Sequence, residues 1–261
     1  MPEYKHGQPP PSGRPCRDQS CQTCPTRTRC LPRGLSDSDC ALVNQSVVQR
    51  HGLLRGEYLY RTNDPVGHRL YAIRSGQFKT YHLSPDGEQR IAGFQFAGDF
   101  LGLDAIGLAL HRNTTVALSD ALLCEFSHPR LVEATQGSPA LAARLRELLG
   151  SQLARAQTIS LLLANRAEQK ISGFLLALPA DQRDDERHTM VLNLAMSRAD
   201  IGAYLGLADT TVSRTLSRFQ RLGYLRLRHR QLTILDAVAL RAIGASAQPA
   251  ASGAAPLLGA A

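Results

Sequence analysis

Hydrophobic and polar positions follow two different periods along the chain. Between about residues 56 and 126, short apolar runs alternate with turns that contain glycine, proline or aspartate. This pattern predicts short strands, and the clearest ones cover residues 57–61, 70–74, 78–83, 89–94 and 121–126. Many short strands at regular spacing are typical of a β-barrel or a jelly roll.

Beyond these strands, the apolar positions take the period of helices. Residues 139–165 form a predicted long helix that starts at Pro139, a residue favoured in a first turn. Small and apolar residues recur along it at alternating steps of four and three. This spacing predicts a narrow contact face, here called the seam, along which the helices of two copies of the chain pack in a dimer. The seam residues are Leu149, Leu153, Ala156, Ser160, Leu163 and Ala167. The alternative is a helix packed on its own domain, although Leu145, Leu148, Leu161 and Leu162 supply further packing faces.

Residues 197–223 predict two helices joined by a tight turn. The sequence from Ser197 to Asp200 fits a capping box, so the first helix begins there, and residues 206–208 form the turn. The second helix opens at Asp209 and ends at Gly223, with Val212, Leu216 and Phe219 on its buried face. The opposite face is suited to the major groove of DNA, and its expected contacts are Thr210, Ser213, Arg214, Ser217 and Arg218, with Arg221 beside them.

A basic stretch continues after this helix. Leu225-x-Leu227 and Leu232-x-Ile234 alternate around residues 228–231, which predicts a hairpin wing. From Thr210 to Leu235 there are six arginines and no acidic residue. Together with a net charge of +8 and a pI near 9.5, this favours double-stranded DNA as a partner. A basic face that is merely solvated is the alternative.

A run of cysteines lies near the other end of the chain. Cys21-x2-Cys24-x5-Cys30 brings three thiols close together, and an iron–sulfur cluster needs four. Cys16, Cys40 and Cys124 are the candidates for the fourth. A structural zinc site is an alternative use of the same thiols. The spacing Cys16-x4-Cys21-x2-Cys24 also matches plant-type ferredoxins, which would make the chain a 2Fe–2S electron-transfer protein.

Composition excludes several classes of protein. No apolar run approaches the roughly 20 residues of a membrane span, and the polar, proline-rich N-terminus is unlike a secretory signal. We therefore expect a cytoplasmic protein with no membrane partner, in which thiols stay reduced and favour metal over disulfides. Residues 1–15 and 246–261 are expected to be disordered. No catalytic pattern is recognised, so we expect no enzyme and assign no catalytic residue.

These segments together resemble the CRP/FNR family of bacterial transcription regulators, and within it the oxygen-sensing FNR branch. The resemblance covers about residues 16–243. Residues 55–60 and 70–76 resemble the first strands of the family's β-roll, and residues 200–207 and 212–214 resemble its helix-turn-helix. Residues 98–107 resemble the FNR version of the segment that holds cyclic AMP in the CRP branch.

The resemblance implies an α+β fold. It consists of an N-terminal β-roll, which is jelly-roll-like and cyclic-nucleotide-binding-like, a long dimerisation helix and a C-terminal winged helix-turn-helix. The expected boundaries are 1–15 for a disordered N-terminus, 16–138 for the cysteine segment and β-roll, 139–167 for the dimerisation helix, 168–245 for the DNA-binding domain and 246–261 for a disordered tail.

The resemblance also implies a mechanism. In the FNR branch, three N-terminal cysteines and one β-roll cysteine hold an oxygen-labile 4Fe–4S cluster that favours the dimer. The dimer binds TTGAT-like palindromes and acts with RNA polymerase, and oxygen abolishes binding. Carried over by position, the ligands are Cys21, Cys24, Cys30 and Cys124, while Cys16 and Cys40 are surplus.

The sequence departs from the family pattern in two places. Thr210 replaces the glutamate of the usual Glu-x-x-Ser-Arg motif, which leaves the base preference at that position open, and Asp209 is expected to cap the helix. Residues 98–107 lack the Arg-Ser pair that holds the cyclic phosphate, so we expect no response to cyclic AMP. A regulator of the same fold that senses nitric oxide or general redox state is the nearest competitor.

Overall fold

The computed structural model describes residues 20–84, 86–184 and 189–245. The chain divides into two compact units, Met1–Gln157 and Thr158–Ala261. The long helix α3 (Pro139–Leu162) begins in the first unit and ends in the second. The sequence predictions for 1–15, for 246–261 and for Cys16 concern residues outside the described parts.

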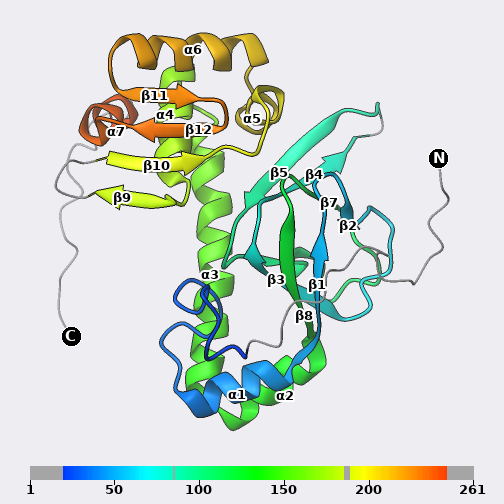
Figure 1. Ribbon diagram of the computed structural model, residues 1–261. Helices are drawn as coiled ribbons and strands as arrows, with labels where there is room; N and C mark the ends of the chain where they lie inside the picture. The colour runs from blue at the N-terminus through cyan, green and yellow to red at the C-terminus, as the bar shows by residue number, and fades with distance from the viewer. Residues whose placement is uncertain (1–19, 85, 185–188, 246–261) are drawn as a thin grey trace, which may run out of the picture. The chain divides into compact units, whose positions relative to one another are not determined.

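The first unit is a β-roll of two antiparallel sheets, with short helices at one end (Figure 1). The sheets have the strand orders β1-β8-β3-β6 and β2-β7-β4-β5. The elements are α1 (Asp37–Gln45), β1 (Val47–Leu53), β2 (Tyr58–Tyr60), β3 (Arg69–Ser75), β4 (Phe78–Leu83), β5 (Gln89–Gln95), β6 (Phe100–Leu101), the 3-10 turn η1 (Leu103–Ala105), β7 (Thr114–Ala117), β8 (Ala121–Ser127) and α2 (His128–Gly137).

Strand β8 separates two hydrophobic clusters. Leu123 packs between the two sheets, together with Ile73 and Phe78. Cys124 and Phe126 belong to a second cluster on the other side, where the sheet meets α1, α2 and the start of α3. Since successive side chains of a strand point to opposite faces, this division follows directly from the period of two. Cys124 and Phe126 therefore share one face of β8.

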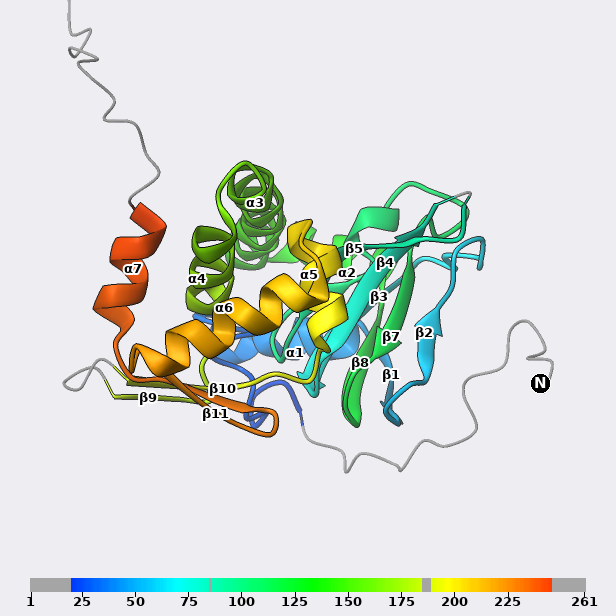
Figure 2. The same ribbon diagram turned by 90° about the horizontal axis from the view of Figure 1, so that it is seen from above.

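The second unit holds a helix pair and a third antiparallel sheet, of order β11-β12-β10-β9. Figure 2 shows α4 beside α6, with which it is in contact. Helix α4 also contacts α7, and α5 contacts α6. The elements are α4 (Ala167–Ala177), β9 (Gln182–Asp184), β10 (Thr189–Asn193), α5 (Arg198–Leu205), α6 (Asp209–Arg221), β11 (Leu225–Arg228), β12 (Gln231–Ile234) and α7 (Ala237–Ala245).

All five predicted strands are present, but the predicted helix 139–165 is too long. Helix α3 ends at Leu162, after which the bond from Leu163 N to Ile159 O continues the helical pattern for one residue. The chain then tightens, with Asn165 N bonded to Leu162 O, and Arg166 takes an extended backbone as the N-cap of α4. Ala167, counted in the predicted seam, is therefore the first residue of another helix.

Among the residues that the structure describes, no helix is both long and apolar enough to cross a membrane.

Candidate metal centre and nucleic-acid interface

Three of the four predicted ligands lie on the loop that precedes α1. Tight turns shape this loop, with Arg27 N bonded to Cys24 O at 3.0 Å and Cys30 N bonded to Thr26 O at 3.0 Å. Cys21 is buried in the same cluster as Cys124, and Cys30 packs against that cluster. The loop and β8 are therefore brought together although about a hundred residues of chain separate them.

The four thiols form one electrostatic group. Each of Cys21, Cys24, Cys30 and Cys124 interacts with the other three. Burial raises the pKa of Cys21 to about 11 and that of Cys30 to about 12, and it also raises the pKa of Cys124. At neutral pH these thiols are protonated, so a metal that binds here must displace their protons.

Positive charge beside Cys124 opposes the effect of burial. Arg50 and Arg74 both lower the pKa of this thiol, Arg50 also by a hydrogen bond. Arg50 faces Cys124 across the β1–β8 pair and donates to Asn44 Oδ1 at 2.5 Å. Guanidinium groups in this position stabilise thiolate ligands and a negatively charged centre.

The donor set suits a thiolate-bound metal centre. Four sulfurs from two segments are the ligand type that zinc and iron–sulfur clusters use. Within the described ranges, no group of three or more His, Cys, Asp or Glu side chains is arranged to hold a metal ion. The structure therefore brings the cysteine loop against β8 without arranging the thiols as a metal site, and their role as ligands stays a prediction.

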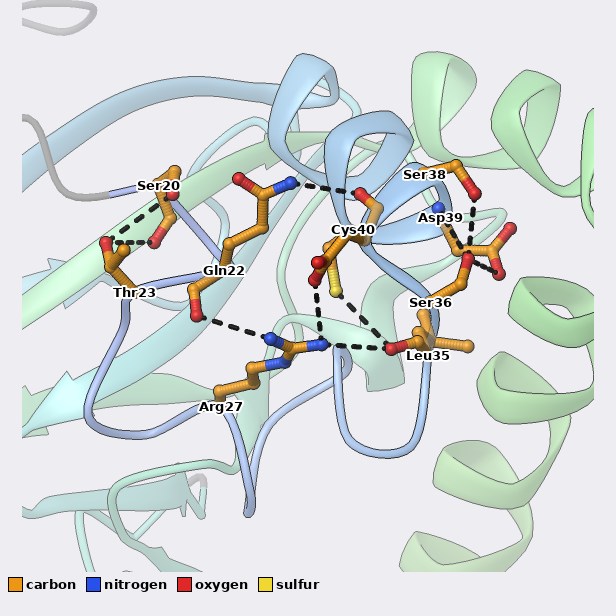
Figure 3. A network of polar contacts seen from close by, with 10 residues as sticks. Ser20, Gln22, Thr23, Arg27, Leu35, Ser36, Ser38, Asp39 and Cys40 are labelled. Atoms are coloured by element: carbon orange, nitrogen blue, oxygen red, sulfur yellow. Dashed lines mark hydrogen bonds and ion pairs between the residues drawn. The ribbon is translucent and has the colours of Figure 1, made fainter.

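Arg27, which lies between Cys24 and Cys30 in sequence, bonds the cysteine loop to residues at the start of α1 (Figure 3). Its guanidinium donates to the Leu35 carbonyl at 3.0 Å and to the Asp37 carboxylate at 3.3 Å. The buried Cys40 thiol donates to the same Leu35 carbonyl at 3.9 Å. Cys40 therefore belongs to the hydrogen-bond network of Arg27 and Leu35 at the start of α1, and it also interacts with Cys21.

Helix α3 contacts this loop and also the turn between β5 and β6. Arg144 Nη2 donates to the Cys30 carbonyl at 3.5 Å, and Arg155 forms an ion pair with Asp99 at 2.9 Å. Next to Asp99, Gly98 has φ +99°, and a Cβ there would lie 2.7 Å from Arg29 Cβ. Only glycine allows the loop to approach this closely.

The start of α3 is also tied to α1. Ser138 Oγ donates to Asp39 Oδ1 at 2.5 Å and accepts from Leu141 N at 3.0 Å. Sequence reasoning missed the bond from Ser138 to Asp39, because it joins residues 99 positions apart and no local pattern indicates it.

The predicted helix-turn-helix is confirmed as a structural element. Asp200 N bonds to Ser197 Oγ and Ser197 N bonds to Asp200 Oδ2, both at 3.0 Å, so the capping box is present. Gly206, the C-cap of α5, has a left-handed backbone conformation, and Gly223 after α6 has φ +76°. The expectation that Asp209 caps α6 is wrong. The N-cap is Ala208, and Asp209 Oδ1 accepts from Thr210 N at 2.6 Å within the first turn.

Helix α6 has the two faces that its sequence predicts. Val212, Leu216 and Phe219 are buried. The five predicted DNA contacts are all exposed: Thr210, Ser213, Arg214, Ser217 and Arg218. Arg218 forms an ion pair with Glu168 on α4, which the sequence did not indicate.

The predicted wing is the hairpin of β11 and β12. Its turn contains His229, with φ +53°, and Arg230. Arg226, Arg228 and Arg230 are exposed. The hairpin therefore presents guanidinium groups that can neutralise phosphates.

Comparison with known proteins identifies both units. Residues 50–137 match the cyclic nucleotide-binding domain, and residues 169–243 match the Crp-like helix-turn-helix domain. The transcriptional activator protein anr of Pseudomonas aeruginosa is 34% identical over 224 residues, which cover 85% of this chain and 91% of that protein. This chain belongs to the CRP/FNR family of transcription regulators.

Two further relatives support this assignment. The anaerobic regulatory protein of Pasteurella multocida is 33% identical over 221 residues, covering 84% of this chain and 81% of that protein. The structure of FixK2 from Bradyrhizobium japonicum is similar with a TM-score of 0.66 and 28% identity, covering 77% of this chain and 98% of that one. This CRP/FNR regulator is thus a DNA-binding transcription regulator of the FNR type.

Proposed function

We propose that this CRP/FNR regulator senses oxygen through a 4Fe–4S cluster held by Cys21, Cys24, Cys30 and Cys124. The observation that carries the proposal is that Cys21 and Cys124 are buried in one cluster against which Cys30 packs, although the loop and the strand lie far apart in sequence. Bound there, the cluster would supply a centre that reacts with oxygen. The naming of a relative as an anaerobic regulatory protein agrees with this role.

The active form is proposed to be a homodimer joined along α3. Leu141 and Leu148 turn toward the first unit's own core and are buried. The seam residues Leu149, Leu153, Ala156, Ser160 and Leu163 are all exposed, and Leu153 retains 63% of its accessible surface. A helix that buries one face in its own unit and exposes a second apolar face is suited to pack against the same helix of a second copy of the chain.

The contacts between the cysteine loop and α3 supply a route from cluster to dimer. Arg144 bonds to the Cys30 carbonyl, and Arg155 pairs with Asp99 beside the loop. Loss of the cluster frees the ligand loop, which loosens these contacts along the helix that carries the seam. A dimeric regulator binds both half-sites of a palindrome at once. Weaker dimerisation therefore lowers the occupancy of the palindrome steeply.

On DNA, Thr210, Ser213, Arg214, Ser217 and Arg218 are proposed to read TTGAT-like half-sites. The dimer would act with RNA polymerase in the cytoplasm, without a membrane partner. The cyclic nucleotide-binding domain would serve as the scaffold for the cluster rather than as a receptor for cyclic AMP, because residues 98–107 lack the Arg-Ser pair.

The experiment compares DNA binding before and after air is admitted. Anaerobically purified protein should bind a duplex with a TTGAT-like palindrome, and exposure to air should release it while iron leaves the protein. Cys124→Ser should remove the response, and Cys40→Ser should preserve it. Binding that ignores air, with zinc retained, would instead establish a zinc-stabilised regulator. Release by nitric oxide alone would establish the nitric oxide alternative.

A further inference from the structure

The first turn of α4 contacts both helices of the helix-turn-helix. Arg166 N bonds to Gln169 Oε1 at 3.0 Å, which fixes the start of α4. From this turn Glu168 reaches Arg218 on α6, and Lys170 reaches the end of α5. Two neighbouring side chains of opposite charge on α4 therefore contact α5 and α6, the two helices of the helix-turn-helix.

Lys170 caps the turn of the helix-turn-helix. Its side chain is only 9% exposed, and Nζ donates to the Leu205 carbonyl at 3.0 Å. Leu205 is the last residue of α5, so its carbonyl lacks the usual partner within the helix. A cation at this position is favoured by the helix dipole as well as by the hydrogen bond.

The turn that Lys170 caps has little freedom. Gly206 is left-handed, with φ 62° and ψ 45°, and a Cβ added to it would lie 3.9 Å from Lys170 Nζ. A Cβ on Gly202 would lie 2.5 Å from the Leu207 carbonyl, because the turn folds back onto α5. The orientation of α6 therefore depends on a tight turn that Lys170 closes.

Glu168 fixes α6 from its other end. It forms an ion pair with Arg218, in the last turn of α6, and both side chains are partly exposed. Arg218 lies one helical turn beyond Arg214, on the exposed face. The pair thus joins α4 to the helix that presents Thr210, Ser213 and Arg214.

We propose that Glu168 and Lys170 are positioning residues for DNA recognition: they hold α6 on α4 so that its exposed side chains meet base edges as one set. Base contacts need correct orientation, whereas binding to random DNA depends mainly on the number of phosphates neutralised. Loss of these contacts from α4 should therefore lower the affinity for the specific sequence and leave the affinity for random DNA unchanged.

The test uses the full-length protein with two duplexes. One is the sequence that the wild-type protein selects most strongly from a random library, and the other is random DNA of equal length. Lys170→Met should lower the ratio of specific to random affinity by roughly tenfold, as expected for one lost charge-assisted hydrogen bond. Lys170→Arg, which keeps a cationic donor, should restore most of the ratio.

Glu168→Gln provides a second variant, at a partly exposed side chain, that keeps the shape of the side chain and removes only its charge. It should lower the same ratio by about two- to fivefold, while random binding stays equal or rises because one negative charge is lost. Glu133→Gln on α2 removes the same charge in the other unit and should leave the ratio unchanged.

The proposal is overturned if Glu168→Gln leaves the ratio at its wild-type value and Lys170→Met either does the same or reduces specific and random binding equally. A fall in the ratio with the circular dichroism spectrum preserved, and recovery in Lys170→Arg, would establish it. All variants keep the four cysteines and are compared with the wild type in anaerobically purified protein. Failure of oxygen sensing would appear as wild-type binding that ignores air, so it is separable from failure here.

Discussion

At the scale of single residues, the surroundings of each cysteine separate ligand from support. Cys124 faces the cysteine loop, interacts with three other thiols and lies beside Arg50. Cys40 lies within α1, and its thiol is bonded to the Leu35 carbonyl. Spacing alone left both as candidates for the fourth ligand, the family resemblance favoured Cys124, and the fold places Cys124 in the buried cluster of Cys21, and Cys40 in the hydrogen-bond network of α1.

Serine substitution tests this distinction. Cys124→Ser should reduce the iron and sulfide content of anaerobically purified protein to near zero, because serine oxygen replaces one of four sulfur ligands. Cys40→Ser should retain about four iron and four sulfide per chain, as a cubane cluster requires. Equal loss of iron in both variants would contradict the assignment of Cys124.

Arg214 and Arg228 should differ in what they contribute to DNA binding. Arg214→Ala should cost about 1–3 kcal/mol on a TTGAT-like site and blunt the preference at its guanine, since a guanidinium can bond to both acceptors of guanine. Arg228→Ala should weaken all sequences similarly and reduce the salt slope by about 1. Fluorescence anisotropy with matched and mutated duplexes at several salt concentrations measures both effects. An Arg214→Ala variant that binds all duplexes as the wild type does would exclude α6 as the reading element.

His111 should make the first unit sensitive to acid. Its ring is buried and stacks on Tyr60, with centroids 3.8 Å apart, and burial lowers its pKa although Asp104 and Asp64 oppose this. The folded state thus prefers neutral histidine, while the unfolded chain takes up a proton as the pH falls below 6.5. Stability should therefore fall between pH 6.5 and the lower folded-state pKa.

Urea unfolding of the wild type and of His111→Phe above and below pH 6.5 measures this loss. Phenylalanine keeps a ring against Tyr60 but cannot be protonated, so its stability should fall less on acidification. His82→Gln, which changes an exposed histidine, serves as the control and should behave like the wild type. Identical pH profiles for all three proteins would rule out His111 as a source of acid sensitivity.

At the scale of elements, periodicity predicted what is local. The capping box of α5, the two faces of α6, the wing and the alternation along β8 follow from residues within one or two turns of one another. Helix α1, strand β1 and strand β7 are among the elements that were not predicted. Their short or polar sequences, such as Thr-Thr-Val-Ala in β7, become ordered through partners elsewhere in the chain.

The exposed face of α3 yields a prediction at this scale. Leu153→Glu should shift the anaerobic protein from dimer toward monomer, because two copies would bring like charges together across the seam. Sedimentation velocity at micromolar concentration measures the shift. Leu83→Glu, at an exposed leucine of β4, is the matched control and should leave the dimer intact. Dimers of equal stability in both variants would place the interface elsewhere.

At the scale of the whole molecule, the sequence predicted the components of a switch but not their connection. The cysteine run, the long helix and the DNA-reading pair were each visible as patterns. Within the first unit, the contacts that join the cysteine segment and α1 to the long helix are single hydrogen bonds between distant segments, such as Arg144 with the Cys30 carbonyl and Ser138 with Asp39. No local period encodes such pairs, because they depend on how the chain folds back on itself.

The visible absorption spectrum of anaerobically purified protein, followed as air is admitted, tests the central claim most directly. We expect a broad brown absorption band that accompanies bound iron and sulfide and changes within minutes of exposure to air. A colourless protein, or a colour that air leaves unchanged, would contradict oxygen sensing by a cluster at Cys21, Cys24, Cys30 and Cys124.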